Sequence, residues 1–223
     1  MAAENKKQDK REAILNAAEN LFAKHGYDGV TLRAIAKEAG VDVALANYHF
    51  GPKRDLFDAV LLRRAQILNS WRLEALEATV QKAAPNPPEV KDIIRAYFEP
   101  LFKRSQVQEP GWKSYYALIA YVNSSPEWGG TLMTQFFDPM IHRFLAVLKT
   151  ALPGVPDKSV YWGYHCLSGA LTLAFAQTGR IDHLSNDLCK SDDLPDACDY
   201  IVDFVAAGFS DMIAASEKEA ATL

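Results

Sequence analysis

Apolar residues recur with helical spacing along almost the whole chain, and this pattern constrains the fold more than any other feature of the sequence. No segment shows the alternation of apolar and polar residues, bounded by turn residues, that is typical of a strand. Proline and glycine divide the chain into helices, which we expect over 9–25, 32–39, 43–50, 52–83, 89–108, 111–123, 131–152, 157–179 and 193–216. The sequence therefore predicts an all-α fold.

We expect this fold to have two parts, an N-terminal three-helix domain over residues 1–55 and a C-terminal helical domain over residues 56–223. Residues 1–72 carry 12 Lys and Arg against 9 Asp and Glu, whereas the remainder carries 12 against 19, and the whole chain has a net charge of −4. The acidic balance of the chain thus hides a basic N-terminal part. A polyanionic partner such as DNA is expected to bind there.

The chain shows no signal for export or for membrane insertion. Its first residues, MAAENKKQDKR, lack the apolar run of a secretory signal. The longest apolar stretch, residues 166–176, is shorter than the roughly 17–25 residues that span a bilayer. Three cysteines at irregular spacing fit a reducing compartment without a disulfide framework. We therefore expect a cytoplasmic protein with no membrane partner.

The segment from Thr31 to Phe50 has the order of a helix-turn-helix. Thr31 is placed to cap the first short helix, and Gly40 supplies the positive φ of a sharp turn after it. Val41 is placed to fill the angle between the helices, and Asp42 to cap the second one. A helical hairpin that only packs would show the same order, so these residues alone leave both interpretations open.

In the DNA-binding interpretation the second helix enters the major groove. Asn47 can pair with an adenine edge there, and the small side chains of Val43 and Ala44 can contact a thymine methyl group. Polar side chains beside them position the protein on phosphates without reading sequence. The predicted DNA-binding residues are Thr31, Arg33, Val43, Ala44, Asn47, Tyr48, His49 and Lys53.

Several motifs in order make residues 9–60 resemble the DNA-binding domain of TetR-family repressors. They are Lys24-His-Gly-Tyr27, Gly29-Val-Thr31, Ile35-Ala36, Ala39-Gly-Val41, Asn47-Tyr-His-Phe50 and Lys53-Arg-Asp-Leu-Phe57. The resemblance implies a homodimer on a near-palindromic double-stranded DNA operator, with half-site centres roughly 34–36 Å apart. Residues 43–45 lack the polar side chains with which many relatives read bases. Specificity is therefore expected to depend on Asn47, Arg33 and DNA shape.

The C-terminal part resembles the CecR-like subgroup of the same family through Phe137-Asp-Pro-Met140, Ala151-Leu-Pro-Gly154, Gly169-Ala-Leu171 and Thr178-Gly179. In the family this region dimerises through its last two helices and holds an inducer. Apolar faces and small residues in 157–179 and 193–216 agree with dimerisation, although burial within one subunit gives the same pattern. The predicted dimer residues are Tyr164, Leu167, Leu171, Phe175, Ile201, Phe204 and Phe209.

Aromatic residues with polar groups are frequent in the middle helices and predict an apolar cavity with a few hydrogen-bonding groups. Core packing explains any single one of them as well. Because few basic residues, mainly Lys113 and Arg143, can pair with an anion, we expect a small uncharged or weakly charged aromatic or drug-like inducer, and no cofactor. The predicted ligand-binding residues are Trp112, Tyr115, Tyr116, Phe136, Tyr161, Trp162 and His165.

A metal site and a catalytic site are both poorly supported. His183, Asp187, Cys189, Asp192, Asp193 and Cys198 are spaced too loosely for known zinc patterns, so we expect a solvated charged loop. The chain has no Gly-x-Ser-x-Gly elbow, Gly-rich phosphate loop or paired-His motif. The leading hypothesis is a repressor released from its operator by an inducer. The alternatives are a DNA-binding regulator without an inducer and an enzyme using the C-terminal cavity.

Overall fold

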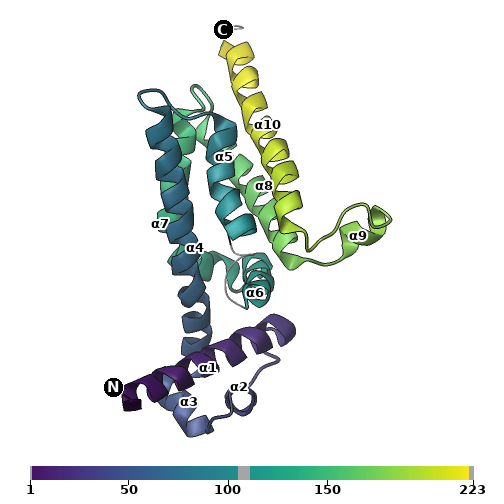
Figure 1. Ribbon diagram of the computed structural model, residues 1–223. Coiled ribbons are helices and arrows are strands. Elements are labelled where there is room, and N and C mark those ends of the chain that lie inside the picture. Colours follow the sequence, from purple (N-terminus) through teal and green to yellow (C-terminus); the bar gives the residue numbers. More distant parts are fainter. Residues whose placement is uncertain (1, 105–110, 221–223) are drawn as a thin grey trace. The chain divides into compact units, whose positions relative to one another are not determined.

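The structure is a computed structural model that describes residues 2–104 and 111–220 (Figure 1). Every regular element in these two ranges is helical, which confirms the predicted all-α fold. The elements are α1 (Ala2–His25), α2 (Leu32–Glu38), α3 (Val43–Phe50), α4 (Lys53–Ala83), α5 (Val90–Glu99), the π-helical turn η1 (Pro100–Arg104), α6 (Trp112–Ser124), α7 (Gly129–Thr150), α8 (Asp157–Ala176), α9 (Arg180–Leu184) and α10 (Leu194–Ala220).

Three stretches differ from the predicted helices, and the first is α1, which begins at Ala2 rather than at residue 9. Residues 89–108 were expected to form one helix, but α5 ends at Glu99 and η1 follows it to Arg104, while residues 105–108 lie outside the described ranges. Pro100 begins this turn, and its lack of an N–H group interrupts the regular hydrogen bonding of the helix. The segment expected to be a charged loop contains the short helix α9. Asp182 of α9 accepts a hydrogen bond from the Ser191 backbone N–H at 2.9 Å, which ties the helix to the chain that follows it.

The chain divides into two compact units at places that differ from the predicted boundary at residue 55. Unit 1 consists of Met1–Gln66 and Glu109–Phe136, and unit 2 of Ile67–Gln108 and Phe137–Leu223. The division falls within α4 and α7, and α6 packs against α1 in unit 1. The small helical domain recognised in the sequence therefore packs together with a later segment of the chain.

Unit 1 has an apolar core between α1, α2, α3, α6 and the first part of α4. Its largest buried side chains include Phe22 of α1 and Phe57 of α4, whose rings meet edge to face with centroids 4.9 Å apart. Burial of each such side chain on folding contributes about 1.5–3 kcal/mol to the stability of the folded state. Gly26 ends α1 as a left-handed cap with a φ of 66°, and its N–H donates to the Phe22 carbonyl at 2.9 Å.

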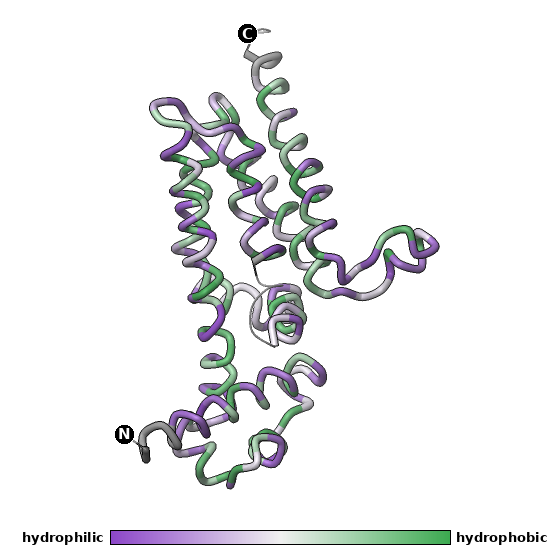
Figure 2. Tube along the Cα trace, in the orientation of Figure 1, coloured by the Kyte–Doolittle hydropathy of each residue, from purple (hydrophilic) through white to green (hydrophobic). Residues whose placement is uncertain are grey.

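In unit 2, α10 packs against α5 and α8 (Figure 1). Hydrophobic residues recur along each of these helices (Figure 2). Gly163 of α8 lies directly against the Phe209 ring of α10, so this contact leaves no room for a side chain at residue 163. None of the helices in the described part of the chain is both long and apolar enough to cross a membrane.

Candidate nucleic-acid interface

The helix-turn-helix in unit 1 forms as its sequence predicts, with one difference at a cap. Thr31 Oγ1 accepts a hydrogen bond from the Ala34 N–H at 3.1 Å and so caps α2. Gly40 has a φ of 64°, and the Val41 N–H donates to the Ala36 carbonyl at 2.9 Å. Asp42 occupies the N-cap position of α3, but its side chain makes no capping hydrogen bond, contrary to expectation. Its backbone carbonyl instead accepts from the Leu45 N–H at 3.0 Å.

Helix α3 has one buried side and one exposed side. Ala46 and Phe50 are buried in unit 1, whereas Ala44 and Asn47 are exposed, as are Val43 at 42% and Tyr48 at 71%. His49 is half-buried, and Thr31 and Arg33 are exposed at the start of α2. A recognition helix requires such an exposed side, because base edges must be reached by side chains that the fold does not use. The individual base and phosphate contacts stay predictions.

Lys53 has a structural role that the sequence did not reveal. Its ammonium group donates to the backbone carbonyls of Tyr27 at 2.9 Å and Val30 at 3.0 Å, and lies 4.0 Å from the centre of the Tyr27 ring. Two of the three ammonium protons are thereby used within unit 1. Lys53 thus holds the chain between α1 and α2. The phosphate contact predicted for Lys53 depends on its third ammonium proton and on the start of α4.

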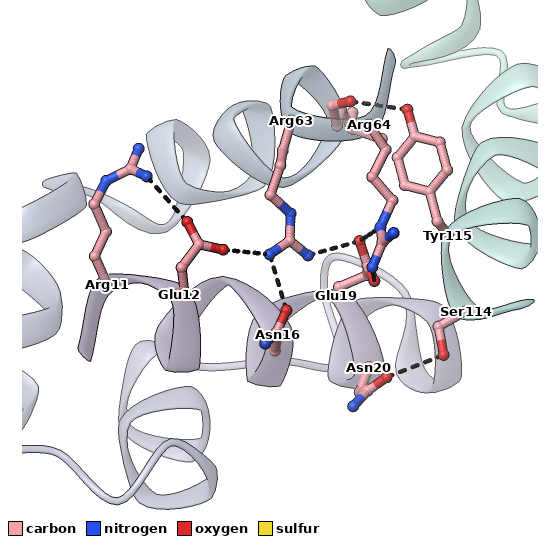
Figure 3. Close-up of polar contacts among 10 residues, drawn as sticks. Arg11, Glu12, Asn16, Glu19, Asn20, Arg63, Arg64, Ser114 and Tyr115 are labelled. Atoms are coloured by element: carbon pink, nitrogen blue, oxygen red, sulfur yellow. Dashed lines mark hydrogen bonds and ion pairs between the residues drawn. The ribbon is translucent and has the colours of Figure 1, made fainter. Parts of the chain in front are cut away.

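A buried group of charged side chains joins α1 to α4 (Figure 3). Glu19 of α1 is 1% exposed and Arg64 of α4 is 4% exposed. Arg64 donates to both Glu19 carboxylate oxygens, from Nε at 2.8 Å and from Nη2 at 3.1 Å. Arg63 donates to the same carboxylate at 3.0 Å and also to Asn16 at 2.8 Å and Glu12 at 3.1 Å. The charge of Glu19 is thus matched by two guanidinium groups.

The beginning of α6 packs on this charged group. The Arg64 guanidinium lies 4.6 Å from the centre of the Trp112 ring. Figure 3 shows Tyr115 nearby, and its hydroxyl donates to the Leu61 carbonyl at 2.8 Å. Gly111 has a φ of 103°, and a Cβ there would lie 2.5 Å from Arg64 Nη2 and 2.6 Å from Glu19 Oε1. Only glycine fits this position. The chain entering α6 is therefore fixed to the helices that carry the helix-turn-helix.

Neither unit contains the predicted ligand-binding residues as one cluster. Trp112, Tyr115, Tyr116 and Phe136 are buried side chains of unit 1. Tyr161, Trp162 and His165 lie on α8 of unit 2 and are exposed, Tyr161 at 51% and Trp162 at 60%. Spacing along the sequence does not reveal which unit a helix joins, so the sequence alone could not separate these two groups.

Two hollows of unit 2 involve other residues. One of about 930 Å³ lies between α4 and α5, and most of its polar lining is charged, including Glu74, Lys82 and Asp92. Another of about 540 Å³ has a mostly apolar lining from α8, α9 and α10, including Leu173 and Tyr200. None of the predicted ligand-binding residues lines either hollow.

Most of the predicted dimer residues do not lie on the exposed apolar side of α8 and α10. Leu167, Phe175 and Phe209 are buried within unit 2, while Tyr164, Leu171 and Ile201 are half-buried. Among the predicted residues only Phe204 is largely exposed, at 83%. We call the exposed side the α8–α10 face, and it comprises Trp162, Cys166, Gly169, Leu173, Tyr200, Phe204, Ala207 and Gly208.

A capped helix, a glycine turn and a second helix with an exposed side define a helix-turn-helix protein. Residues 14–60 match the family described as bacterial regulatory proteins, tetR family. Residues 95–208, just over half of the chain, match the tetracyclin repressor-like C-terminal domain. The chain therefore belongs to the tetR family of bacterial regulatory proteins. The more specific resemblance to the CecR-like subgroup stays a prediction.

Curated relatives match part of the chain. The HTH-type regulator BetI of Agrobacterium fabrum is 36% identical over 76 residues, which are 34% of this chain and 35% of BetI. The HTH-type regulator RutR of Escherichia coli is 39% identical over 90 residues, 40% of each chain. The HTH-type repressor AcnR of Corynebacterium glutamicum is 38% identical over 60 residues, 27% of this chain and 32% of AcnR. The matches thus span about a third to two fifths of these relatives.

Solved structures share the fold over most of their length. A proposed fatty acid metabolism regulator of Clostridium perfringens has a TM-score of 0.61 at 20% identity, over 88% of this chain and 97% of the other. HlyIIR, a hemolysin II transcriptional regulator, has a TM-score of 0.56 at 20% identity, over 87% and 97%. At these identities the likeness establishes the arrangement of helices.

Proposed function

We propose that this chain is a homodimeric transcriptional repressor that binds a near-palindromic DNA operator and is released from it by a small molecule. The exposed side of α3 carries this proposal, because it follows a capped α2 and a sharp turn within the segment that matches the tetR family. The curated relatives are named as transcriptional regulators, and AcnR as a repressor. Because this chain belongs to the same family, we propose transcriptional regulation for it as well.

In this proposal Asn47 reads a base, while Val43 and Ala44 contact thymine methyl groups in the major groove. All three side chains are on the exposed side of α3. Tyr48 and Thr31 supply neutral hydrogen-bonding groups for phosphates, and Arg33 supplies a positive charge at the start of α2. With so few polar groups on α3, the deformability of the operator contributes to specificity.

Asn47→Ala is expected to weaken binding to the preferred sequence by about 5- to 150-fold, as expected for the loss of one good base contact. The preferred sequence is obtained by selecting from random duplex DNA with the native protein, and affinity is measured by fluorescence anisotropy at several salt concentrations. Lys82→Ala is the control, because Lys82 is an exposed residue of α4 in unit 2. The assigned face would be contradicted if Asn47→Ala bound the selected DNA as tightly as the native protein does and both proteins bound random DNA equally well.

Dimerisation is proposed through the α8–α10 face. Leu173, Tyr200 and Phe204 are exposed at 66%, 73% and 83%, although they are large hydrophobic side chains. Gly169 and Gly208 have open space where a Cβ would stand, so a helix of a second copy can approach closely. A two-fold axis through such a surface places the same residues opposite one another and forms a four-helix interface.

The cysteines give a test of this interface. We expect Cys166, an exposed residue of the α8–α10 face, to react slowly with a thiol reagent in the native dimer and rapidly in a monomeric variant. Cys198 is buried, and burial raises the pKa of its thiol to about 11, so it should react only on unfolding. Mass spectrometry of the labelled peptides distinguishes the sites, and half-buried Cys189 serves as an internal reference. A Cys166 rate that is the same in dimer and monomer would place the interface elsewhere.

Release by a ligand requires unit 2 to influence unit 1. Helix α4 belongs to both units, Lys53–Gln66 to unit 1 and the remainder to unit 2. If α4 has a different orientation in DNA-binding and released dimers, a ligand that binds one orientation more tightly shifts the equilibrium between the two forms. The identity of that ligand depends on the polar groups inside unit 2.

A further inference from the structure

Arg72 of α4 is buried in unit 2, and none of the described carboxylates pairs with it. The residue is 2% exposed, and its Nε is buried with no hydrogen-bond partner. Its Nη2 donates to Asn69 Oδ1 at 2.8 Å. Within residues 8–103 and 111–216, whose side chains the structure describes, no Asp or Glu oxygen lies within the 4.0 Å of an ion pair with Arg72. Unit 2 therefore encloses a positive charge that none of these described carboxylates neutralises by direct contact.

Arg64, two turns earlier on the same helix, shows what a satisfied buried arginine looks like in this protein. It is 4% exposed and makes two hydrogen bonds to the Glu19 carboxylate. Arginine stays protonated at any pH at which the protein is folded, so neither guanidinium can escape the cost of burial by losing its charge. Among the described residues, Arg64 thus has a carboxylate partner and Arg72 has none.

The surroundings of Arg72 suit the polar end of a small organic acid. The guanidinium carbon lies 4.8 Å from the centre of the Tyr97 ring of α5 and 5.6 Å from that of Phe137 of α7. Aromatic rings cover the faces of a guanidinium, whereas a carboxylate pairs with its edge in the plane, through Nε and the adjacent Nη. The atom without a partner, Nε, belongs to that edge.

Tyr164 of α8 adds a neutral donor to this group. Burial raises the pKa of the Tyr164 hydroxyl far above its usual value, Tyr97 raises it further, and Arg72 lowers it. The half-buried Asp138 also raises it, so its charge is felt in the same region although it makes no ion pair with Arg72. The interaction with Tyr97 includes a hydrogen bond, so the two hydroxyl groups together leave one proton to donate to a bound anion.

We propose that Arg72 binds the carboxylate of a small aromatic or aliphatic acid inside unit 2, beside Tyr97, Phe137 and Tyr164. This proposal rests on the proposed function, since it names the chemical class of the releasing ligand. It replaces the uncharged ligand expected from the sequence, because that expectation considered only Lys113 and Arg143. Arg143 is already engaged by Glu77 at 2.6 Å. A buried water can accept the Nε–H hydrogen bond but supplies no negative charge.

The test compares acids with their neutral amides on the full chain: benzoate with benzamide, and octanoate with octanamide, with inorganic phosphate as a further anion. We expect at least one acid at about 100 times its dissociation constant to raise the melting temperature by about 5–10 °C, and its amide to leave it unchanged. Arg72→Met removes this shift while preserving volume, and Arg72→Gln does the same if the methionine variant folds poorly. Arg143→Met, at an exposed arginine, retains the shift.

Any of three results would overturn the proposal, and the first two concern the acids and their amides. One is a panel in which no acid stabilises the native chain more than it stabilises Arg72→Met and Arg72→Gln. The other is an amide that stabilises the native chain as much as its acid. A shift given by phosphate but by no carboxylate would also overturn the assigned ligand class. These measurements use no DNA, so their outcome is independent of whether the protein binds an operator. Failure of the ligand proposal can therefore be distinguished from failure of the proposed function.

Discussion

Glu19→Ala is expected to lower the free energy of unfolding by about 3–5 kcal/mol, because it leaves Arg64 buried with no carboxylate and takes one partner from Arg63. Removing one member of a buried pair has this large effect even where the intact pair adds little net stability. The Trp112 ring on the guanidinium offers only partial compensation. Urea unfolding followed by circular dichroism measures the change, and the summed fluorescence of the four tryptophans gives a second probe of the same transition.

Glu12→Gln is the matched control, since Glu12 also pairs with Arg63 but its side chain is 42% exposed. We expect it to change stability by less than about 1 kcal/mol. The double variant Glu19→Leu with Arg64→Met should recover much of the lost stability, because replacing a buried ion pair by apolar side chains is often neutral. A Glu19→Ala variant as stable as Glu12→Gln would show that the buried charges are solvated in solution.

Phe204→Asp is expected to convert the dimer to monomers and to weaken operator binding by about 10²- to 10⁴-fold, the usual loss when two linked binding events become separate. In the proposed dimer this side chain faces the apolar surface of a second copy, where an unpaired carboxylate is costly. In one subunit it is 83% exposed, so the fold should be preserved. Sedimentation velocity measures the assembly, and fluorescence anisotropy on selected DNA measures the affinity.

Leu73→Asp is the control for this substitution. Leu73 is a hydrophobic residue of α4 exposed at 41%, and it lies outside the α8–α10 face. It should leave both dimerisation and DNA affinity close to the native values. A Phe204→Asp protein that remains dimeric would exclude the proposed interface, while a monomer that still binds DNA at native affinity would exclude the need for two linked half-sites.

Local signals in the sequence were sufficient to predict the helix-turn-helix. The predicted range 43–50 coincides with α3, because a glycine turn precedes it and Gly51 ends it with a φ of 73°. Thr31 caps α2 as expected. These signals involve neighbours within a few residues, so no tertiary information is needed to interpret them.

The orientation of α8 and α10 could not be predicted in this way. Both helices carry apolar residues on two sides, such as buried Leu167 and exposed Leu173 on α8. Periodicity identifies an apolar side but does not show whether the same subunit or another copy covers it. The residues predicted for the dimer lie on these two helices and, except for Phe204, on their buried or half-buried side.

The buried arginines were missed although a signal for them exists. Phe57, Leu61, Leu68 and Leu76 form a row along α4 at helical spacing, and Arg64 and Arg72 fall in the same row. Both arginines were treated as surface charges in the sequence and were therefore not placed in this buried row. A charged residue within an apolar row indicates either a partner inside the protein, as Glu19 is for Arg64, or a charged ligand, as we propose for Arg72.

The packing of α6 in unit 1 determines which pieces of such a regulator can be exchanged between relatives. A chimera joined at the end of α3 would take Glu19 from one parent and Arg64, Gly111 and Trp112 from the other. A recombination that transfers residues 1–66 together with 109–136 keeps these contacting side chains from one ancestor. Operator specificity is therefore inherited most safely as two separate stretches of the gene.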